Sequence, residues 1–293
     1  MGVVNVTPDS FSDGGRFLDA RAAVTHGQDL AAEGADILDI GGESTRPGAE
    51  PVSIEEELRR VIPVIEGLMD STPTHPQISI DTSKAAVAEA ALDAGASLVN
   101  DVSAFRADPV IAGLVADSGA ECCLMHMLGE PRTMQRDPRY GEVVAEVKAF
   151  LEERLRFAVG EGVREDRIML DPGIGFGKTV AHNLELLRRL DELAALGRPL
   201  VIGTSRKSFL GRIAADAAGL AEPLEAGHRL PGTIASNVLA LERGASVFRV
   251  HDVAPVREAL TVAAATLGGR WTASRGTTTS ETTTWMAEPT ERG

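Results

Sequence analysis

The sequence predicts an α/β fold, a single-domain (β/α)8 TIM barrel. Eight short apolar runs alternate with segments of helical spacing, and almost every run ends in a polar or glycine-rich cluster. In such a barrel the strand ends open on one face, where the following loops carry the chemistry. The 293 residues, 43% of them hydrophobic, are enough to bury a large core. We expect the barrel to span residues 1–268, and a Thr-, Ser- and Glu-rich flexible tail to span 269–293.

The apolar runs are the expected strands, and they lie at Met1–Val6, Asp36–Ile40, Gln77–Ile80, Ser97–Val99, Glu121–Met125, Arg167–Leu170, Pro199–Ile202 and Ser246–Val250. Between them, apolar residues recur every three or four positions, so that one stripe of each helix faces the sheet. The expected helices are Ala20–Glu33, Ser53–Met69, Ser83–Ala94, Pro109–Ser118, Tyr140–Glu161, His182–Leu196, Lys207–Ala218, Thr233–Glu242 and Val256–Ala264. Several helices end in a Gly-Ala pair, whose glycine supplies a left-handed cap before the next strand.

Charge and composition exclude several classes of protein. The net charge is -14 and the chain has no block of Lys or Arg, which argues against nucleic-acid binding and against an anionic membrane surface. No apolar stretch reaches the roughly 18 residues of a membrane span. Cys122 and Cys123 are adjacent in a strand, so they should face opposite sides and stay unpaired. Two buried thiols suit a reducing cytosol, and we expect a cytoplasmic protein.

Three expected strands end in side chains that accept hydrogen bonds, namely Asp81, Asn100 and Asp171. Such acceptors suit a planar heterocycle with ring N–H and amino donors, because each buried polar edge must find a partner. A single strand-end Asp often only caps the next helix, and Asp81 could do so. Capping is a poor explanation for three such residues on one face.

The segment Asp171–Lys178 contains three glycines that let the backbone approach a flat ligand closely. It is not a phosphate-binding P-loop, because Pro172 stands where that motif requires glycine. It also lacks the Gly-x-Gly-x-x-Gly order of a dinucleotide site. The alternative is a turn that only connects a strand to a helix.

Cations gather at the same expected face of an acidic chain: Arg46, Lys207, Arg249 and His251. Arg249 and His251 are two positions apart in a strand, so they could hold one phosphate together. Arg206 could equally be a structural ion-pair partner. The histidines lack zinc-site spacing, whereas Mg²⁺ needs few protein ligands and Asn5 would be a suitable one.

An ordered set of motifs closely resembles the dihydropteroate synthase family of pterin-binding TIM barrels. The motifs lie at Asn5–Gly15, Gly41–Gly48, Ser79–Thr82, Asn100–Val102, Met125–Met127, Asp171–Lys178, Ser205–Ser208 and Arg249–Asp252. The family joins 6-hydroxymethyl-7,8-dihydropterin diphosphate to p-aminobenzoate, and it forms 7,8-dihydropteroate and diphosphate. The resemblance therefore implies a transferase of folate biosynthesis that uses Mg²⁺, and we expect a homodimer.

The resemblance also implies a role for each matching residue. Asp81, Asn100, Asp171 and Lys207 would bind the pterin, in a pocket shaped by Phe176 and Gly203. The metal ligand would be Asn5, and the diphosphate would lie against Arg249 and His251. Val250, between them, would be a further substrate-binding residue. The p-aminobenzoate site would form when two loops, at 9–15 and 41–49, close, and its residues would be Thr45, Arg46, Pro47 and Ser208. The residues expected to be catalytic are Asp81, Lys207, Arg249 and His251.

Three alternatives stay open. Phe105 lies in a loop that borders the aminobenzoate pocket in the family, so the chain could be a sulfonamide-insensitive variant of the same enzyme. A pterin-binding methyltransferase would keep the pterin acceptors but has no need of the Ser44–Pro47 loop or of the Arg249 and His251 pair. A catalytically silent paralogue should have lost site residues, and none is lost here.

Overall fold

The computed structural model describes residues 1–7, 16–45, 48–71 and 76–268. Its strands are β1 (Gly2–Asn5), β2 (Ile37–Gly41), β3 (Gln77–Asp81), β4 (Leu98–Asp101), β5 (Glu121–Met125), β6 (Ile168–Asp171), β7 (Leu200–Ile202) and β8 (Ala245–Phe248). All eight expected strands are confirmed, with boundaries that shift by a residue or two at most ends. The boundary at 268 stays a prediction, because the tail at 269–293 lies outside the described residues.

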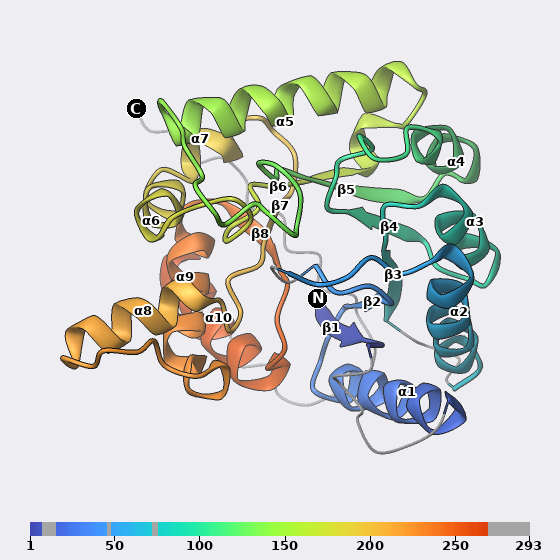
Figure 1. The fold of residues 1–293 in the computed structure, drawn as a ribbon, viewed down its shortest axis with the longest axis horizontal. Coiled ribbons are helices and arrows are strands. Elements are labelled where there is room, and N and C mark those ends of the chain that lie inside the picture. Colours follow the sequence, from blue (N-terminus) through green and yellow to red (C-terminus); the bar gives the residue numbers. More distant parts are fainter. Residues whose placement is uncertain (8–15, 46–47, 72–75, 269–293) are drawn as a thin grey trace.

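Helices follow the strands and surround them in Figure 1. They are α1 (Arg16–Ala32), α2 (Ile54–Ser71), α3 (Ala85–Asp93), α4 (Val110–Ser118), α5 (Val143–Gly160), α6 (Val180–Arg188), α7 (Asp191–Ala194), α8 (Ser208–Ala217), α9 (Leu230–Glu242) and α10 (Val253–Gly268). Two short 3-10 helices, η2 (Glu165–Arg167) and η3 (Ala226–His228), complete the described elements. None of the helices in these ranges combines the length and apolar character needed to cross a membrane.

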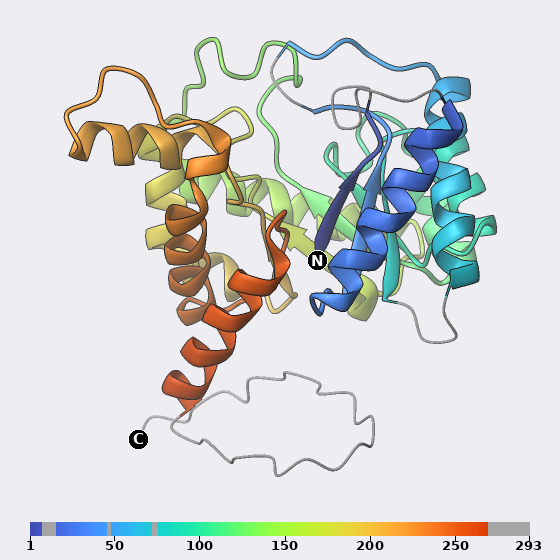
Figure 2. The same cartoon turned by 90° about the horizontal axis from the view of Figure 1, so that it is seen from below.

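The strands form one parallel sheet in the order β1 to β8, as the barrel prediction requires. The sheet closes on itself, since Gly2 pairs with Val250 in a parallel bridge beyond the end of β8. The Val3 N–H donates to the Val250 carbonyl at 3.0 Å, and the Val250 N–H donates to the Met1 carbonyl at 2.9 Å. All strand ends therefore point to one mouth, with α1 and α10 on either side of the closing seam (Figure 2).

Alternation along the strands separates two layers inside the barrel. Leu98, Cys123, Met169 and Val201 form an apolar cluster in the lower interior. Asn100 and Asp171 lie two residues further along β4 and β6, so the next layer towards the mouth is polar. The neighbouring Cys122 belongs instead to the large core between the sheet and the helices. Both cysteines are buried and free, which confirms that they face opposite sides and do not pair.

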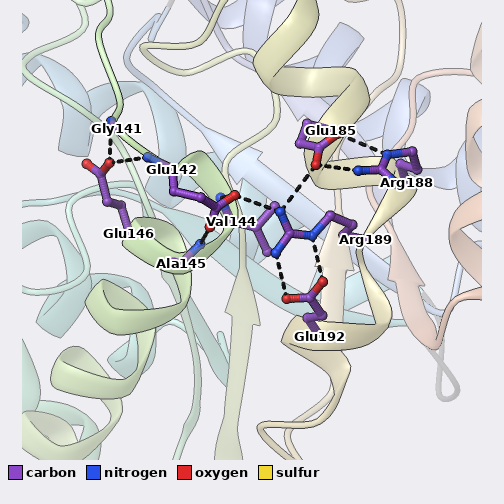
Figure 3. Close-up of polar contacts among 9 residues, drawn as sticks. All are labelled: Gly141, Glu142, Val144, Ala145, Glu146, Glu185, Arg188, Arg189 and Glu192. Carbon is purple, nitrogen blue, oxygen red and sulfur yellow. Dashed lines mark hydrogen bonds and ion pairs between the residues drawn. The ribbon is translucent and has the colours of Figure 1, made fainter.

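The prediction of one continuous helix over 182–196 is wrong, because the structure has two helices there, α6 and α7. The backbone leaves helical geometry at Arg189, with φ -115° and ψ 32°. The Arg189 guanidinium lies between three elements in Figure 3, bonding to Glu192 at 2.6 Å, to Glu142 at 2.7 Å and to Glu185 at 3.2 Å. Two of these ion pairs are local, whereas the bond to Glu142 spans 47 residues, a contact that helical spacing alone does not reveal.

Candidate active site

A buried carboxylate of β2, Asp39, is at the centre of the polar layer. Its oxygens accept hydrogen bonds from Ser79 Oγ of β3 at 2.6 Å, from Asn100 Nδ2 of β4 at 3.0 Å and from Arg249 Nε at 2.6 Å. The side chain of Asp39 is fully buried. A buried anion is stable only when it is paired and hydrogen-bonded, and these three donors meet that need.

Arg249 joins Asp39 to the predicted catalytic carboxylate, Asp81. Its Nη2 donates to Asp81 Oδ2 at 2.8 Å, while its Nε remains on Asp39. Burial raises the pKa of Asp81 to about 7; the Arg249 charge opposes this rise and the Asp39 charge adds to it. The carboxyl of Asp81 therefore titrates near neutral pH.

Helix capping does not explain Asp81. The residue before α3 is Lys84, which makes no side-chain cap, and the first N–H of that helix donates to Asp108 at 2.9 Å. Asp81 faces Arg249 in the barrel mouth instead. The capping alternative for Asp81 is therefore wrong, because its carboxylate pairs with Arg249 across the barrel.

The glycine-rich segment after β6 folds tightly over Asp171. Asp171 Oδ1 accepts the Gly173 N–H at 2.6 Å, and burial raises the pKa of this carboxyl. Gly173, Gly175 and Gly177 all have positive φ, at 66°, 84° and 62°. A Cβ on Gly173 would lie 1.8 Å from the His126 carbonyl oxygen, so only glycine fits there.

Lys207 lies against this segment. Its ammonium group bonds to the Ile174 carbonyl and lies 4.1 Å from the centroid of the Phe176 ring. Burial lowers the pKa of Lys207 to about 7; the Asp171 charge opposes the fall and Arg249 adds to it. The Asp171 charge acts on Arg249 as well. Lys207 and Asp171 thus face the same mouth as the Arg249 cluster.

The segments after β7 and β8 hold each other by side-chain bonds. Ser205 Oγ and His251 Nδ1 are 2.9 Å apart, and the His251 N–H donates to the same oxygen at 3.1 Å. Arg206 pairs with Asp252 through Nε at 3.0 Å and Nη2 at 2.5 Å. The ion-pair interpretation of Arg206 is confirmed.

The remaining predicted residues lie at different depths. Gly203 lies at the end of β7, where a Cβ would be 4.0 Å from that of Arg249. Val250 has its side chain in the helix-facing core, and its backbone closes the barrel. Thr45 is half-buried, whereas Ser208 is exposed at the start of α8. Arg46, Pro47 and the whole loop at 9–15 lie outside the described residues.

Phe105 is completely buried in the core between the sheet and the helices. Its backbone has φ 62°, and its N–H donates to Asp101 Oδ2 at 2.7 Å. Its side chain is therefore not exposed at the mouth. Any effect of this residue on a ligand would act through the loop backbone.

Asn5, the predicted Mg²⁺ ligand, is the last residue of β1 and is partly buried. It pairs in register with Gly41, which pairs with Asp81, so it lies at the carboxyl end of the sheet. In the part of the chain that the structure describes, no group of three His, Cys, Asp or Glu side chains could hold a metal ion. A neutral amide oxygen at the carboxyl end of the sheet fits Mg²⁺, which needs few protein ligands because water and substrate phosphate oxygens can complete its shell.

Sequence reasoning missed two residues that the structure places at the site. Asp39 was available as a charged residue inside the apolar run at 36–40, a pattern that indicates a buried polar partner. Lys178 was included only as the last residue of the Asp171–Lys178 motif and was given no role of its own. It is 3% exposed, with Nζ 2.9 Å from His126 Nδ1 and 3.0 Å from the Phe176 carbonyl.

Comparison with known proteins agrees with this geometry. Residues 1–251 match the family described as pterin binding enzyme. The dihydropteroate synthase of Mycobacterium leprae (strain TN) is 48% identical over 269 residues, which cover 91% of this chain and 93% of that protein. The chain belongs to the dihydropteroate synthase family. The resemblance carried by the motifs is therefore confirmed.

Solved dihydropteroate synthases also share the fold. The enzyme of Xanthomonas albilineans, solved with 4-aminobenzoic acid, has a TM-score of 0.83 and 49% identity, covering 91% of this chain and 92% of that one. Its structure with 7,8-dihydropteroate has a TM-score of 0.79 and 46% identity, with the same coverage. As a member of the dihydropteroate synthase family, the chain is an enzyme, a transferase of folate synthesis.

Proposed function

We propose that this chain transfers the pterin-methyl group of 6-hydroxymethyl-7,8-dihydropterin diphosphate to the amino nitrogen of p-aminobenzoate. The products are 7,8-dihydropteroate and diphosphate, so the group transferred is an alkyl group other than methyl. The observation that carries the proposal is the gathering of Asp81, Asn100 and Asp171 with Lys207 in one barrel mouth. Related enzymes solved with 4-aminobenzoic acid and with 7,8-dihydropteroate support it.

In this proposal the buried acceptors recognise the pterin. Ring N–H and amino donors need partners when the pterin leaves water, and Asp171 and Asn100 supply oxygens that lie deep in the barrel. The aromatic ring of Phe176 beneath the Lys207 ammonium forms an edge against which a flat heterocycle can pack. Glycine at 203, at the end of β7, adds no side chain to the space beside Arg249.

Bond breaking places opposite charges on the two fragments. The bond between the methylene carbon and the diphosphate oxygen breaks, and the electron pair leaves with diphosphate. The carboxylate of Asp81 stabilises the positive charge that develops on the pterin methylene. The amino nitrogen of p-aminobenzoate then attacks that carbon, and its proton is released to solvent.

The leaving diphosphate meets Arg249 and His251. Arg249 already donates through Nε and Nη2 to two carboxylates, but a guanidinium carries five N–H groups and retains others for phosphate oxygens. Bound Mg²⁺, with Asn5 as a ligand, would supply further positive charge to the leaving group. Holding both substrates in one site contributes much of the remaining rate advantage.

The assay supplies pterin diphosphate, p-aminobenzoate and Mg²⁺ to the purified chain and measures dihydropteroate and diphosphate. We expect both products in equal amounts, a requirement for Mg²⁺, and loss of activity in Arg249→Met. Pterin binding without product would identify a silent paralogue. Transfer of a methyl group from methyltetrahydrofolate would identify the methyltransferase alternative.

Three further expectations belong to this proposal. The resemblance supports a homodimer, which light scattering would reveal as twice the chain mass of 30.9 kDa. The two free buried thiols support a reducing cytoplasm. Repeating the assay with a sulfonamide, in the native chain and in Phe105→Leu, tests whether the chain is a sulfonamide-insensitive variant.

A further inference from the structure

Lys178 is a buried lysine that the proposed reaction does not use. It is 3% exposed, and it is the last residue of the glycine-rich segment Asp171–Lys178 after β6. Its Nζ donates to the Phe176 carbonyl at 3.0 Å and lies 2.9 Å from His126 Nδ1. A lysine buried this deeply is uncommon, because its long side chain and charge favour water.

His126 is the partner of Lys178 and comes directly after β5. Its own N–H donates to the Asp171 carbonyl at 2.9 Å, and its ring packs edge-on against Phe150 at 4.8 Å. Burial lowers the pKa of His126 to about 2, helped by the nearby cations of Lys178 and Arg106. The ring is therefore neutral, and donation from Lys178 to Nδ1 would leave the ring proton on Nε2.

The bonds of Lys178 do not depend on its charge. Burial lowers the pKa of Lys178 well below its usual value, but a neutral amine still has two protons for its two acceptors. One bond reaches the β5 end and the other reaches the carbonyl of Phe176. The buried Lys178 side chain thus connects the segment after β5 to the segment after β6.

Phe176, whose carbonyl accepts the Lys178 bond, lies next to Lys207 of the proposed pterin site. The Phe176 ring lies 4.1 Å from the Lys207 ammonium, and Gly175 packs against the Lys207 side chain. The same segment begins at Asp171. A shift of the Phe176 backbone would therefore move the ring, Lys207 and the neighbouring acceptor together.

We propose that Lys178 is a positioning residue for the pterin site, holding Phe176 against Lys207 by its paired bonds to His126 and the Phe176 carbonyl. This inference rests on the function proposed above. It assigns no contact between Lys178 and substrate. It predicts that breaking the connection weakens binding of the pterin, whereas the p-aminobenzoate site keeps its affinity.

The test is Lys178→Met, which keeps the length of the side chain and removes both donors. We expect KM for the pterin diphosphate to rise about tenfold, the factor that corresponds to losing about one buried hydrogen bond. KM for p-aminobenzoate at saturating pterin should stay within about twofold. A general loss of structure would instead raise both values or lower kcat alone.

Tyr140→Phe is the matched control. It removes one hydrogen bond to the same loop, from the Tyr140 hydroxyl to the Gly177 carbonyl at 2.9 Å, without touching Phe176. Both KM values should stay within about twofold of the native protein. Equal effects in the two variants would show that any loosening of the loop suffices, and would overturn the inference.

A second pair of variants covers failure of Lys178→Met to fold. His126→Gln keeps an oxygen that can accept from Lys178, whereas His126→Leu removes the acceptor. Only His126→Leu should weaken binding of the pterin diphosphate. Calorimetry measures the affinity for the pterin diphosphate even if the native chain forms no product. Failure of this inference can therefore be distinguished from failure of the proposed function. Unchanged pterin affinity in both Lys178→Met and His126→Leu would overturn the inference.

Discussion

The two sides of the barrel mouth hold their polar groups by different means. On the side of β2, β3 and β8, Arg249 lies between the carboxylates of Asp39 and Asp81. On the side of β6 and β7, Lys207 and Lys178 donate to main-chain carbonyls of the glycine-rich segment. The polar groups around Arg249 are held by ion pairs, whereas Lys207 and Lys178 are held by the positions of backbone carbonyl groups.

This difference determines which changes each side tolerates. In the Arg249 cluster the pKa of Asp81 depends on the charges of Arg249 and Asp39, so a neutral replacement of the same shape alters the chemistry. In the glycine-rich segment the positions of the carbonyl oxygens depend on positive φ, so a single added methyl group alters the structure. Substitutions on the two sides should therefore affect different measurements.

The largest effect is expected from Gly173→Ala. The new Cβ would lie 1.8 Å from the His126 carbonyl oxygen, a backbone atom, and the residue would keep φ 66°. We expect the free energy of unfolding to fall by about 4 kcal/mol or more, as for severe strain at a buried site. Urea unfolding followed by circular dichroism measures the change.

Gly119→Ala is the control for this prediction. Gly119 has a similar φ of 69°, but no atom lies within 4 Å of the position of its Cβ. It should lose only about 1 kcal/mol, the cost of the left-handed backbone. Equal losses at the two positions would mean that the close approach to His126 contributes nothing.

Much of the fold and part of the site could be predicted from the sequence. The strands could be found because each is a short apolar run ending in polar residues, a local pattern. Asp81, Asn100, Asp171 and Lys207 could be assigned to one mouth because parallel strands bring their ends together. That inference needs no knowledge of distances.

The pairings could not be predicted, because they depend on which side chains meet across the barrel. Arg249 and Asp39 are 210 residues apart, and nothing local to either shows that they bond. Arg249 was expected to be catalytic and to bind the diphosphate, yet it also bonds to two carboxylates. Lys178 and His126 likewise meet from different strand ends, 52 residues apart.

The second prediction concerns Asp39→Asn, which removes charge from the Arg249 cluster. The Asp39 charge raises the pKa of Asp81, so its loss should lower that pKa below about 7. If the Asp81 carboxylate is the active form, kcat/KM of the native chain rises as pH increases through about 7. In the variant we expect the midpoint of this rise to move about one pH unit lower.

Ser79→Ala is the matched control for the pH profile. It removes the 2.6 Å hydrogen bond from Ser79 Oγ to Asp39 and changes no charge. Its midpoint should stay close to that of the native chain. A midpoint in Asp39→Asn that is unchanged, or that moves to higher pH, would contradict the coupling between the two carboxyls.

The smallest effect is expected from Arg206→Met. Arg206 is next to Lys207, but it pairs with Asp252, and the two side chains are 39% and 21% exposed. An ion pair with this exposure contributes about 1 kcal/mol or less, and urea unfolding should show a loss of that size. Because the guanidinium faces Asp252 rather than the Arg249 cluster, KM for the pterin diphosphate should not change. Arg249→Met is the comparison, and it should raise that KM strongly; a similar rise in Arg206→Met would place both cations in the binding site.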